Sequence, residues 1–209
     1  MTPFRTPHAR SKPGVRQANS GFTMIELMIV VVIVAILIAL AAPSFTPLIE
    51  RWRVRDSAET LTSTLFYARS EAIKRGGRVI MTKSADSTDC TTGGVDTKWD
   101  CGWHIFFDAN DDGSQGTCVA TDTPNECDLQ VTPSPSRVEI NLPSSTGSIT
   151  IDRWGMLSHT PVGGGSAAPT SMSFELKPKG KNLSDSSAAK LCTSTGGRIV
   201  RIKGSDTCP

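Results

Sequence analysis

One acidic residue interrupts the most apolar stretch of this 209-residue chain. Residues 27–42 carry no charged or polar side chain, and Glu26 stands directly before them in a run that begins at Phe22. A carboxylate in a membrane costs on the order of 2.5 to 3.5 kcal/mol at the centre and less near the edge, so it needs a cationic partner. If the chain were cut after Gly21, the new amine of Phe22 would lie about one helical turn away. We therefore expect Glu26 to pair with that amine, in its own chain or in a neighbouring subunit, where the pair would set the register of a polymer.

The apolar run is long enough to cross a membrane. Residues 22–42 would form a helix of about 31 Å, which is the thickness of a bilayer core. Two alternatives are an ordinary secretory signal, with a small-x-small cleavage site at Ala39-Leu40-Ala41, and a plain signal anchor. Neither of them explains Glu26.

Six cysteines follow the apolar run, in stretches rich in Gly, Ser, Thr and Asp. An even number in such stretches is typical of disulfides in an oxidising compartment, so we expect this part to face the periplasm or the exterior. Sequence alone does not choose among the many pairings. We favour the sequential one, because each bridge would close one local loop: Cys90 with Cys101, Cys118 with Cys127, and Cys192 with Cys208. A zinc site is the alternative, but no C-x-x-C or Cys/His spacing supports it.

The formal net charge of +2 hides an uneven distribution. Four cations and no acid precede the apolar run: Arg5, Arg10, Lys12 and Arg16. Residues 84–131 hold ten Asp and Glu against one Lys, whereas residues 152–204 hold eight Lys and Arg against three acids. We expect an acidic lobe and a basic C-terminal lobe.

Apolar residues at helical spacing continue beyond the apolar run. They recur every three or four residues, which is the stripe of an amphipathic helix: Val54, Ala58, Leu61, Leu65, Ala68 and Ala72. Two cations followed by Gly76 and Gly77 form a helix C-terminal signal. The pattern predicts one helix from about Phe22 to Arg75, kinked near Pro43, whose part over residues 43–76 packs on a sheet.

Short runs of β-formers separated by turn residues follow Gly77. They predict strands near residues 78–82, 102–108, 128–131, 137–142, 148–152, 171–176 and 198–203, with loops at 133–135 and 162–169. A helix followed by strands predicts an α+β fold, in which the long helix packs against an antiparallel sheet. Residues 77–209 would form one β-rich globular domain.

The segment from Gly21 to Val30, Gly-Phe-Thr-Met-Ile-Glu-Leu-Met-Ile-Val, resembles the processing site of type IV pilins and type II secretion pseudopilins. Pro43 also stands where pilins usually carry a proline. The resemblance implies that residues 1–21 are a leader, which a prepilin peptidase removes before Phe22, and that Phe22 is then N-methylated. It also implies that residues 22–42 anchor the chain in the inner membrane, with a periplasmic domain that later joins a pilus or pseudopilus.

Further residues resemble the H-type pseudopilin and minor pilin family over nearly the whole remaining chain. They are Glu59, Leu65, Ala68, Arg69, Glu71 and Ala72, then Gly102-Trp103 before Phe106 to Asn110, and Gly197-Arg198. The resemblance implies a minor pilin that primes pilus assembly or sits at the tip, with other minor pilins and the major pilin as partners. A minor pseudopilin of a type II secretion system is the alternative, and nothing in the sequence separates the two.

Basic residues near the C-terminus favour a different class of function, DNA binding. DNA-binding minor pilins of this family carry Gly-Arg-x-Arg, whereas this chain has one residue more between the two arginines, Arg198 and Arg201. In a strand, Arg201 and Lys203 share one face and Arg198 points to the other. Together with Lys177 and Lys179 they would contact phosphates of DNA. A solvated strand face, or a patch that docks the acidic lobe of a neighbour, is the alternative.

The segment Asp108-x-Asn110-x-Asp112-Gly113 resembles the first half of a calcium loop. The twelfth position is Val119 and not the bidentate glutamate of an EF-hand, so we expect an acidic turn without a metal. Neither His104 nor His159 stands beside a nucleophile motif. We expect no enzymatic activity and no cofactor.

Overall fold

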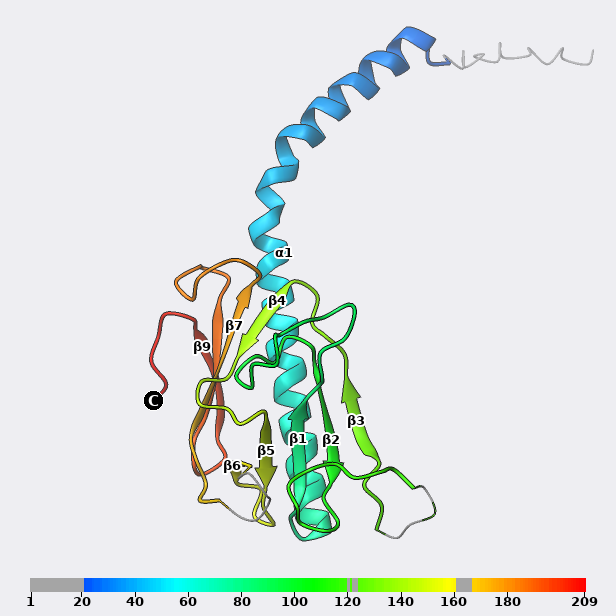
Figure 1. Cartoon of the computed structure of the whole chain (residues 1–209). Coiled ribbons are helices and arrows are strands. Elements are labelled where there is room, and N and C mark those ends of the chain that lie inside the picture. Colours follow the sequence, from blue (N-terminus) through cyan, green and yellow to red (C-terminus); the bar gives the residue numbers. More distant parts are fainter. Residues whose placement is uncertain (1–20, 120, 122–123, 161–166) are drawn as a thin grey trace, which may run out of the picture. The chain divides into compact units, whose positions relative to one another are not determined.

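A long helix precedes all the strands in this computed structural model, which describes residues 21–119, 121, 124–160 and 167–209 (Figure 1). Side chains of residues 41–44 are not described, and the predicted leader and part of the predicted loop at 162–169 lie outside the described residues. The chain divides into two units, residues 1–43 and 44–209, which we treat separately.

Helix α1 covers Met24–Arg75, close to the predicted bounds. Its C-terminus has the expected signal, because Gly76 adopts a φ of 82° and the amide of Gly77 donates to the carbonyl of Ala72 at 2.7 Å. This is the Schellman motif, which satisfies a carbonyl that the last helical turn leaves free. No single unbroken helix among the described residues is both long and apolar enough to span a membrane, whereas Met24–Leu40 and Phe45–Arg75 taken together as a broken span are, by length and composition. The kink near Pro43 stays a prediction.

The strands form two antiparallel sheets. The first has the order β3-β2-β1-β5-β6 and the second the order β4-β7-β8-β9. The bounds are β1 Val79–Lys83, β2 Trp103–Phe107, β3 Asp128–Thr132, β4 Val138–Asn141, β5 Ser148–Ile151, β6 Leu157–His159, β7 Met172–Pro178, β8 Ala189–Thr193 and β9 Ile199–Lys203. The predicted α+β class with antiparallel pairing is confirmed, but the expectation of a single sheet was wrong.

The core lies between the helix and both sheets. Every residue of the predicted stripe is buried, and it packs with large side chains from both sheets, among them Trp99, Trp103 and Phe174. In Figure 1, α1 runs along the strands of the first sheet and beside those of the second. One face of the helix therefore stabilises the whole globular unit by burial of apolar surface.

Two strands, β6 and β8, were not predicted. β8 has the sequence Ala-Lys-Leu-Cys-Thr, which contains mostly weak β-formers, and β6 is only three residues long. β8 becomes a strand because it pairs with β7 on one side and with β9 on the other. Such long-range pairing overrides local propensity.

All six cysteines form disulfides, and none is free. The bridges join Cys90 to Cys101, Cys118 to Cys127 and Cys192 to Cys208, which is the sequential pairing that the sequence analysis favoured. Each bridge closes a local loop of the globular unit. The last one ties the C-terminal tail to β8.

Candidate functional site

The N-terminus of α1 is organised by Thr23. Its Oγ1 accepts a hydrogen bond from the amide of Glu26 at 3.2 Å, and its carbonyl accepts one from the amide of Leu27 at 3.2 Å. Thr23 and Glu26 thus have the spacing of a capping box, and an acidic side chain in the first turn interacts favourably with the helix dipole. This cap was not predicted, although its Thr-x-x-Glu pattern is visible in the sequence. The cap holds Glu26 in the first turn of the helix.

Apolar side chains from Phe22 to Leu40 are exposed all around the helix. The described residues provide no ion pair to Glu26. A contiguous exposed apolar surface marks a site of contact with a membrane or a protein partner. Within the described residues, this surface is therefore uncovered and Glu26 has no ion-pair partner.

A second exposed apolar stripe lies on α1 within the globular unit. Trp52, Phe66 and Ile73 are 62%, 53% and 59% exposed, and they are separated by multiples of seven residues. Residues seven apart on a helix lie nearly in line, so the three side chains share one face. Glu59 occupies the remaining position of this line and is paired with Arg55 at 2.7 Å. The buried stripe of α1 was predicted from the sequence, but this outer one was not.

Arg69, a residue that carried the family resemblance, connects the helix to both sheets. Its Nη1 donates a hydrogen bond to the carbonyl of Gly197, in the turn between β8 and β9. A side chain on Gly155, in the turn between β5 and β6, would come within 3.2 Å of the Arg69 Nε. Gly155 and Gly197 have φ values of 75° and 78°, which only glycine adopts easily. The motif residues Arg69 and Gly197 thus have a structural role in fixing the helix to the two sheets.

Gly102 is also required by the backbone. Its φ is 88°, and a Cβ on it would collide with the carbonyl of Thr132. Trp103 follows it and is buried against the helix. The Gly102-Trp103 pair, which carried the family resemblance, therefore allows the start of β2 to lie close to the end of β3.

The calcium-like segment is an acidic turn. The buried carboxylate of Asp108 accepts hydrogen bonds from the amides of Asp111 at 2.7 Å and Gly113 at 2.9 Å. Glu126, also buried, accepts one from the amide of Gly116 at 2.6 Å. Among the described residues, no group of three or more His, Cys, Asp or Glu side chains could hold a metal ion. These carboxylates satisfy backbone amides of the loop instead.

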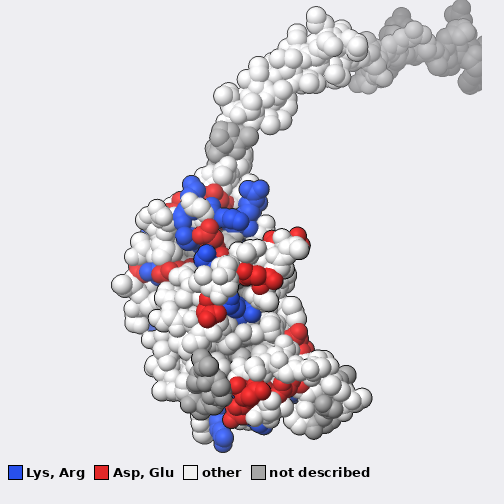
Figure 2. Space-filling model, viewed as in Figure 1, with Lys and Arg blue, Asp and Glu red and all other residues white. Residues whose placement is uncertain are grey.

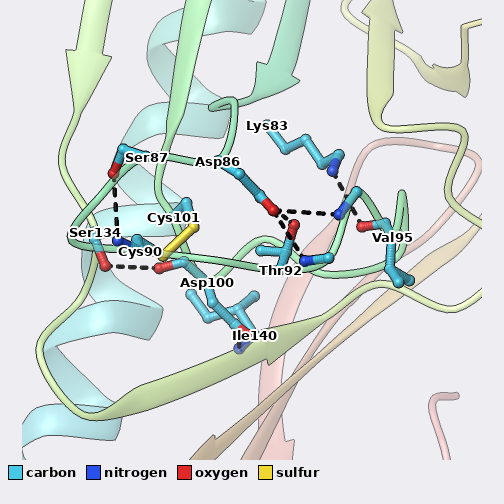
Figure 3. The surroundings of a disulfide bond; sticks show 12 residues. Lys83, Asp86, Ser87, Cys90, Thr92, Val95, Asp100, Cys101, Ser134 and Ile140 are labelled. Atoms are coloured by element: carbon cyan, nitrogen blue, oxygen red, sulfur yellow. Dashed lines mark hydrogen bonds between the residues drawn. A yellow bond between two sulfur atoms is a disulfide. The ribbon is translucent and has the colours of Figure 1, made fainter.

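The loop before β2 is held by polar contacts around the Cys90–Cys101 bridge (Figure 3). Asp86 accepts hydrogen bonds from the hydroxyl of Thr92 and from the amides of Gly93 and Gly94. The bonds from Thr92, with smaller ones from the two glycines, lower the pKa of Asp86 to about 2. The carboxylate of Asp100 accepts a hydrogen bond from the amide of Ile140 at 2.6 Å, and burial raises the pKa of Asp100.

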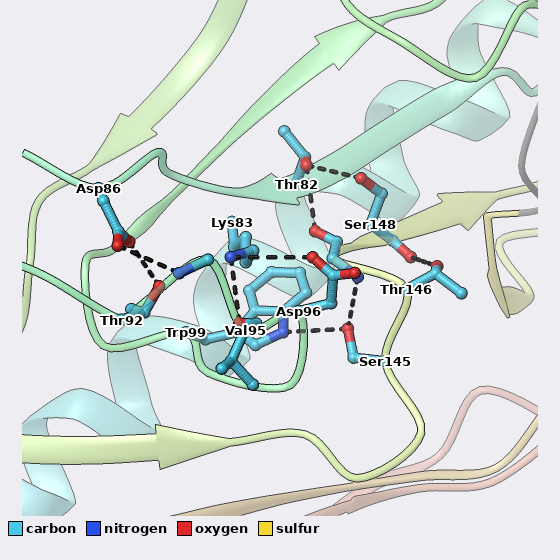
Figure 4. A network of polar contacts seen from close by, with 12 residues as sticks. Thr82, Lys83, Asp86, Thr92, Val95, Asp96, Trp99, Ser145, Thr146 and Ser148 are labelled. Atoms are coloured by element: carbon cyan, nitrogen blue, oxygen red, sulfur yellow. Dashed lines mark hydrogen bonds and ion pairs between the residues drawn. The ribbon is translucent and has the colours of Figure 1, made fainter.

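A second set of contacts fixes the same loop to the first sheet (Figure 4). Lys83 at the end of β1 donates to the carbonyl of Val95 at 3.1 Å and lies 3.9 Å from the carboxylate of Asp96. The indole of Trp99 donates to the hydroxyl of Ser145 at 3.2 Å. The acidic stretch is thus a folded loop whose charges are largely used within the unit.

The basic residues proposed for DNA binding do not form one patch. Arg201 pairs with Leu191, a core residue of β8, so it points to the helix side of the second sheet. There it lies near Glu59, whose pKa is lowered mainly by the hydrogen bond from Arg55 and further by Arg201. Lys177 lies on the opposite face of the sheet and pairs with Glu139 at 3.0 Å. Arg201 and Lys203 share a face, as their spacing predicted, and Lys177 and Lys179 lie together near Glu139.

Two family models match the chain. Residues 57–197 match the model described as type II transport protein GspH, and residues 16–42 match the prokaryotic N-terminal methylation motif. The type II secretion system protein H of Xanthomonas campestris pv. campestris is 32% identical over 74 residues. This match covers 35% of the chain and 43% of that protein, so the chain aligns with less than half of the relative's length.

The fold is similar to that of a solved minor pilin. The type IV minor pilin FimU of Pseudomonas aeruginosa superposes with a TM-score of 0.50 at 21% sequence identity, over 75% of this chain and 92% of that one. A second crystal form gives a TM-score of 0.48 at 21% identity, over 73% and 94% of the two chains. At this identity the likeness concerns the fold alone.

Proposed function

The chain belongs to the family of the type II transport protein GspH, matched over residues 57–197, and on this premise we propose that it is a minor pilin. It would prime the assembly of a type IV pilus or sit at the pilus tip. The observation that carries the proposal is the exposed apolar helix from Phe22 to Leu40 with Glu26 in its first turn. This surface requires a membrane first and neighbouring helices later.

A minor pseudopilin of a type II secretion system is the second candidate. Membership of the type II transport protein GspH family and the similarity to a type II secretion system protein H favour it. Both candidates use the same anchor and the same assembly chemistry. The genes beside this one would separate them, because a pilus subunit should lie among other minor pilin genes and a pseudopilin among secretion genes.

Processing would create the partner of Glu26. We propose that a prepilin peptidase cuts between Gly21 and Phe22, consistent with the N-terminal methylation motif matched over residues 16–42. The new amine would lie four residues before Glu26, just outside the N-terminus of α1, so within one chain the two charges can neutralise each other in the inner membrane. During assembly the carboxylate exchanges its own amine for that of a neighbouring subunit.

The same pair would set the register of the polymer. A carboxylate buried among apolar helices without a partner costs several kcal/mol. Only the axial position that brings Glu26 to the Phe22 amine of a neighbour avoids this cost. Other positions are equally apolar and differ mainly in this one contact, so the ion pair selects the register.

The exposed stripe of Trp52, Phe66 and Ile73 would extend the contact beyond the anchor. A stripe with a seven-residue period is the pattern by which one helix packs along another. We propose that helices of neighbouring minor pilins cover it in the assembled filament. The globular unit would then contribute to the interface through the outer face of α1.

Replacement of Glu26 tests the assembly role. Glu26→Val should be processed normally but should assemble poorly, because no charge remains to fix the register. Glu26→Gln is the matched variant, since it keeps the size and removes only the charge, and it should fail in the same way. Processing is read from the mass of the membrane-bound chain, and assembly from filaments counted by electron microscopy. Wild-type filament numbers in either variant would overturn the proposal.

A further inference from the structure

We propose that the end of the globular unit next to the anchor, residues 22–42, carries a binding site for the phosphate groups of anionic lipids. A hollow of about 590 Å³ lies there, lined by Arg53, Arg137 and Lys179 together with Glu50 and the apolar Ile49. The inference rests on the proposed function for one premise, that the anchor sits in a membrane. Figure 2 shows Lys and Arg side chains gathered at the end of the unit where α1 leaves it.

Three elements bring the cations of this site together. Arg53 comes from α1, Arg137 directly precedes β4, and Lys179 directly follows β7. β4 and β7 pair antiparallel with Val138 opposite Pro178, so the two cations that flank these residues meet at one end of the strand pair. The amide of Lys179 donates to the carbonyl of Arg137 at 3.0 Å. The register of the second sheet thus places the cations, and the helix adds the third.

The three cations of the site form no close ion pair within the described residues. Nearby lysines have partners, because Lys177 pairs with Glu139 at 3.0 Å and Lys181 with Asp185 at 4.0 Å. No ion pair involves Arg53, Arg137 or Lys179 in the part of the chain that the structure describes. Glu50 is the one carboxylate that lines this hollow, while Lys179 also interacts electrostatically with Glu139 and Asp100 outside it. Guanidinium and ammonium groups arranged in this way bind phosphate oxygens well.

Arginine is an unusual residue for the backbone conformation at position 137. Its φ of 59° lies in the left-handed region, which is unfavourable for a residue with a Cβ. Glycine or asparagine would adopt this conformation more easily and would complete the turn before β4 equally well. The arginine therefore contributes something other than local stability, and its charge at the hollow is the contribution that the structure shows.

Chain length places the hollow near the membrane surface. Ile49 lines it and follows Ala42, the last residue of the anchor, by seven residues, which span at most about 25 Å even when fully extended. Anionic lipids attract a nearby cation electrostatically, and this attraction falls off within roughly 10 Å. A tethered subunit can therefore bring the hollow within this range of the lipid phosphates, which are the phosphates nearest to its anchor. DNA binding, in contrast, would not require the cations to lie at the end of the globular unit next to the anchor.

The site would hold the globular unit against the membrane before assembly. Leaving the membrane would break the lipid contact, so neighbouring subunits must replace it during insertion into the filament. Because the attraction is electrostatic, raised salt should weaken it in the wild type without any substitution. The lipid contact would thus exist only in the membrane-bound subunit before it enters the filament.

Full-length processed protein in nanodiscs tests the inference. Headgroup spin-labelled lipid quenches nearby tryptophans, and Trp52 is an exposed one at this end of the unit. Quenching should be stronger in discs that contain phosphatidylglycerol than in discs of phosphatidylcholine alone, and high salt should abolish the difference. Arg137→Asn with Lys179→Gln should shift the equilibrium away from the surface by roughly tenfold or more. Asparagine is chosen because it tolerates the left-handed backbone.

The matched control is Lys74→Gln with Arg153→Gln. It removes two exposed cations at the other end of α1, where Gly77 packs on the backbone of Arg153, and should keep the dependence on phosphatidylglycerol. Equal quenching in both kinds of disc, for the wild type at low salt, would overturn the inference. Binding of inorganic phosphate without any effect of lipid would also overturn it. A third contrary result would be binding of a short DNA duplex that is lost in the Arg137 and Lys179 variant but kept in the control variant. Loss of filaments in Glu26→Val with the lipid effect intact would affect only the proposed function.

Discussion

Gly21 is the residue on which processing should depend. It lies just before the Thr23 cap and outside the helix, so the peptide bond to Phe22 is not part of α1. A bulky side chain at this position would occupy the space next to the bond that the peptidase must reach. We expect Gly21→Phe to accumulate as uncut precursor in the membrane, with Phe22→Leu as a control that is still cut. The mass of the membrane-bound chain is the measurement, and normal maturation of Gly21→Phe would contradict the cleavage site.

Asp86 should give the globular unit a distinct acid sensitivity. Its pKa is lowered from 3.8 to about 2 by its hydrogen bonds, so the folded state holds the proton less tightly than the unfolded state. The stabilisation is therefore complete above pH 4 and is lost as the pH falls toward 2. Asp86→Asn should reduce the slope of unfolding free energy against pH in this window.

Asp89→Asn is the control for that measurement. It removes another exposed carboxylate from the same loop, but the described contacts include no hydrogen bond to its side chain. Urea unfolding at several pH values between 2 and 5 would compare the two variants. An unchanged slope in Asp86→Asn would mean that the contacts to Thr92, Gly93 and Gly94 do not persist in solution.

At the scale of residues, the sequence indicated Glu26 and the cysteine pairs, and it failed at contacts over long distance. The cysteine bridges span only 9 to 16 residues, so local loop closure was a sufficient guide. Arg69 and Gly197 are 128 residues apart, and no local pattern connects them. The Thr23 cap is different, because its four-residue pattern could have been found.

At the scale of elements, the contact between α1 and the turn before β9 gives a test with an internal control. Gly197 and Gly180 share a φ of 78°, but a Cβ on Gly197 would collide with Arg69, whereas one on Gly180 meets open space. Both Gly→Ala variants carry the cost of a left-handed alanine. Gly197→Ala also displaces the guanidinium and its hydrogen bond, so it should lose about 1.5 to 3 kcal/mol more.

Thermal or urea unfolding measures this difference, and Arg69→Ala completes a double-mutant cycle. With Arg69 already removed, Gly197→Ala should cost no more than Gly180→Ala. Equal effects of the two glycine substitutions in the wild-type background would show that Arg69 moves aside without loss.

The disulfides act on the same scale, each on one connection between elements. Their loops have similar lengths, so the chain-entropy account gives each bridge about 2 to 4 kcal/mol and little difference among them. We expect Cys192→Ser with Cys208→Ser to destabilise the unit by this amount, measured by urea unfolding without reductant. The wild type in reductant should lose more, because all three bridges open. A unit indifferent to reductant would contradict a stabilising role.

The elements themselves were largely predictable, and their assembly was not. The helix follows from a period and an end signal that are both local, which is why its C-terminus was found at Arg75. The division into two sheets depends on which strands pair, and β4 leaves its sequence neighbours to pair with β7. No property of residues 138–141 alone contains that information.

At the scale of the whole molecule, charge counted along the sequence was a poor guide to surfaces. The acidic stretch uses Asp86, Asp108 and Glu126 to bind its own backbone amides. The basic stretch is divided between two faces of a sheet and one of its ends. The cluster that did emerge, around Arg137 and Lys179, combines residues that the sequence analysis assigned to different regions.

The two stripes of α1 separate folding from assembly, and two adjacent residues test this. Leu65 is fully buried in the core, whereas Phe66 next to it is 53% exposed on the outer stripe. Leu65→Asp should prevent folding, because it buries an unpaired charge. Phe66→Asp should leave the thermal midpoint nearly unchanged, since surface substitutions usually change stability by less than about 0.5 kcal/mol.

Phe66→Asp should nevertheless reduce the number of filaments, because the charge would have to be buried between helices. Val131→Asp, which changes a comparably exposed apolar residue on β3 instead of on α1, is the matched control and should assemble normally. Midpoints come from thermal unfolding, and filament numbers from electron microscopy. If Phe66→Asp folds and assembles like the wild type, the outer stripe takes no part in the filament, and the exposed anchor alone must hold the subunit there.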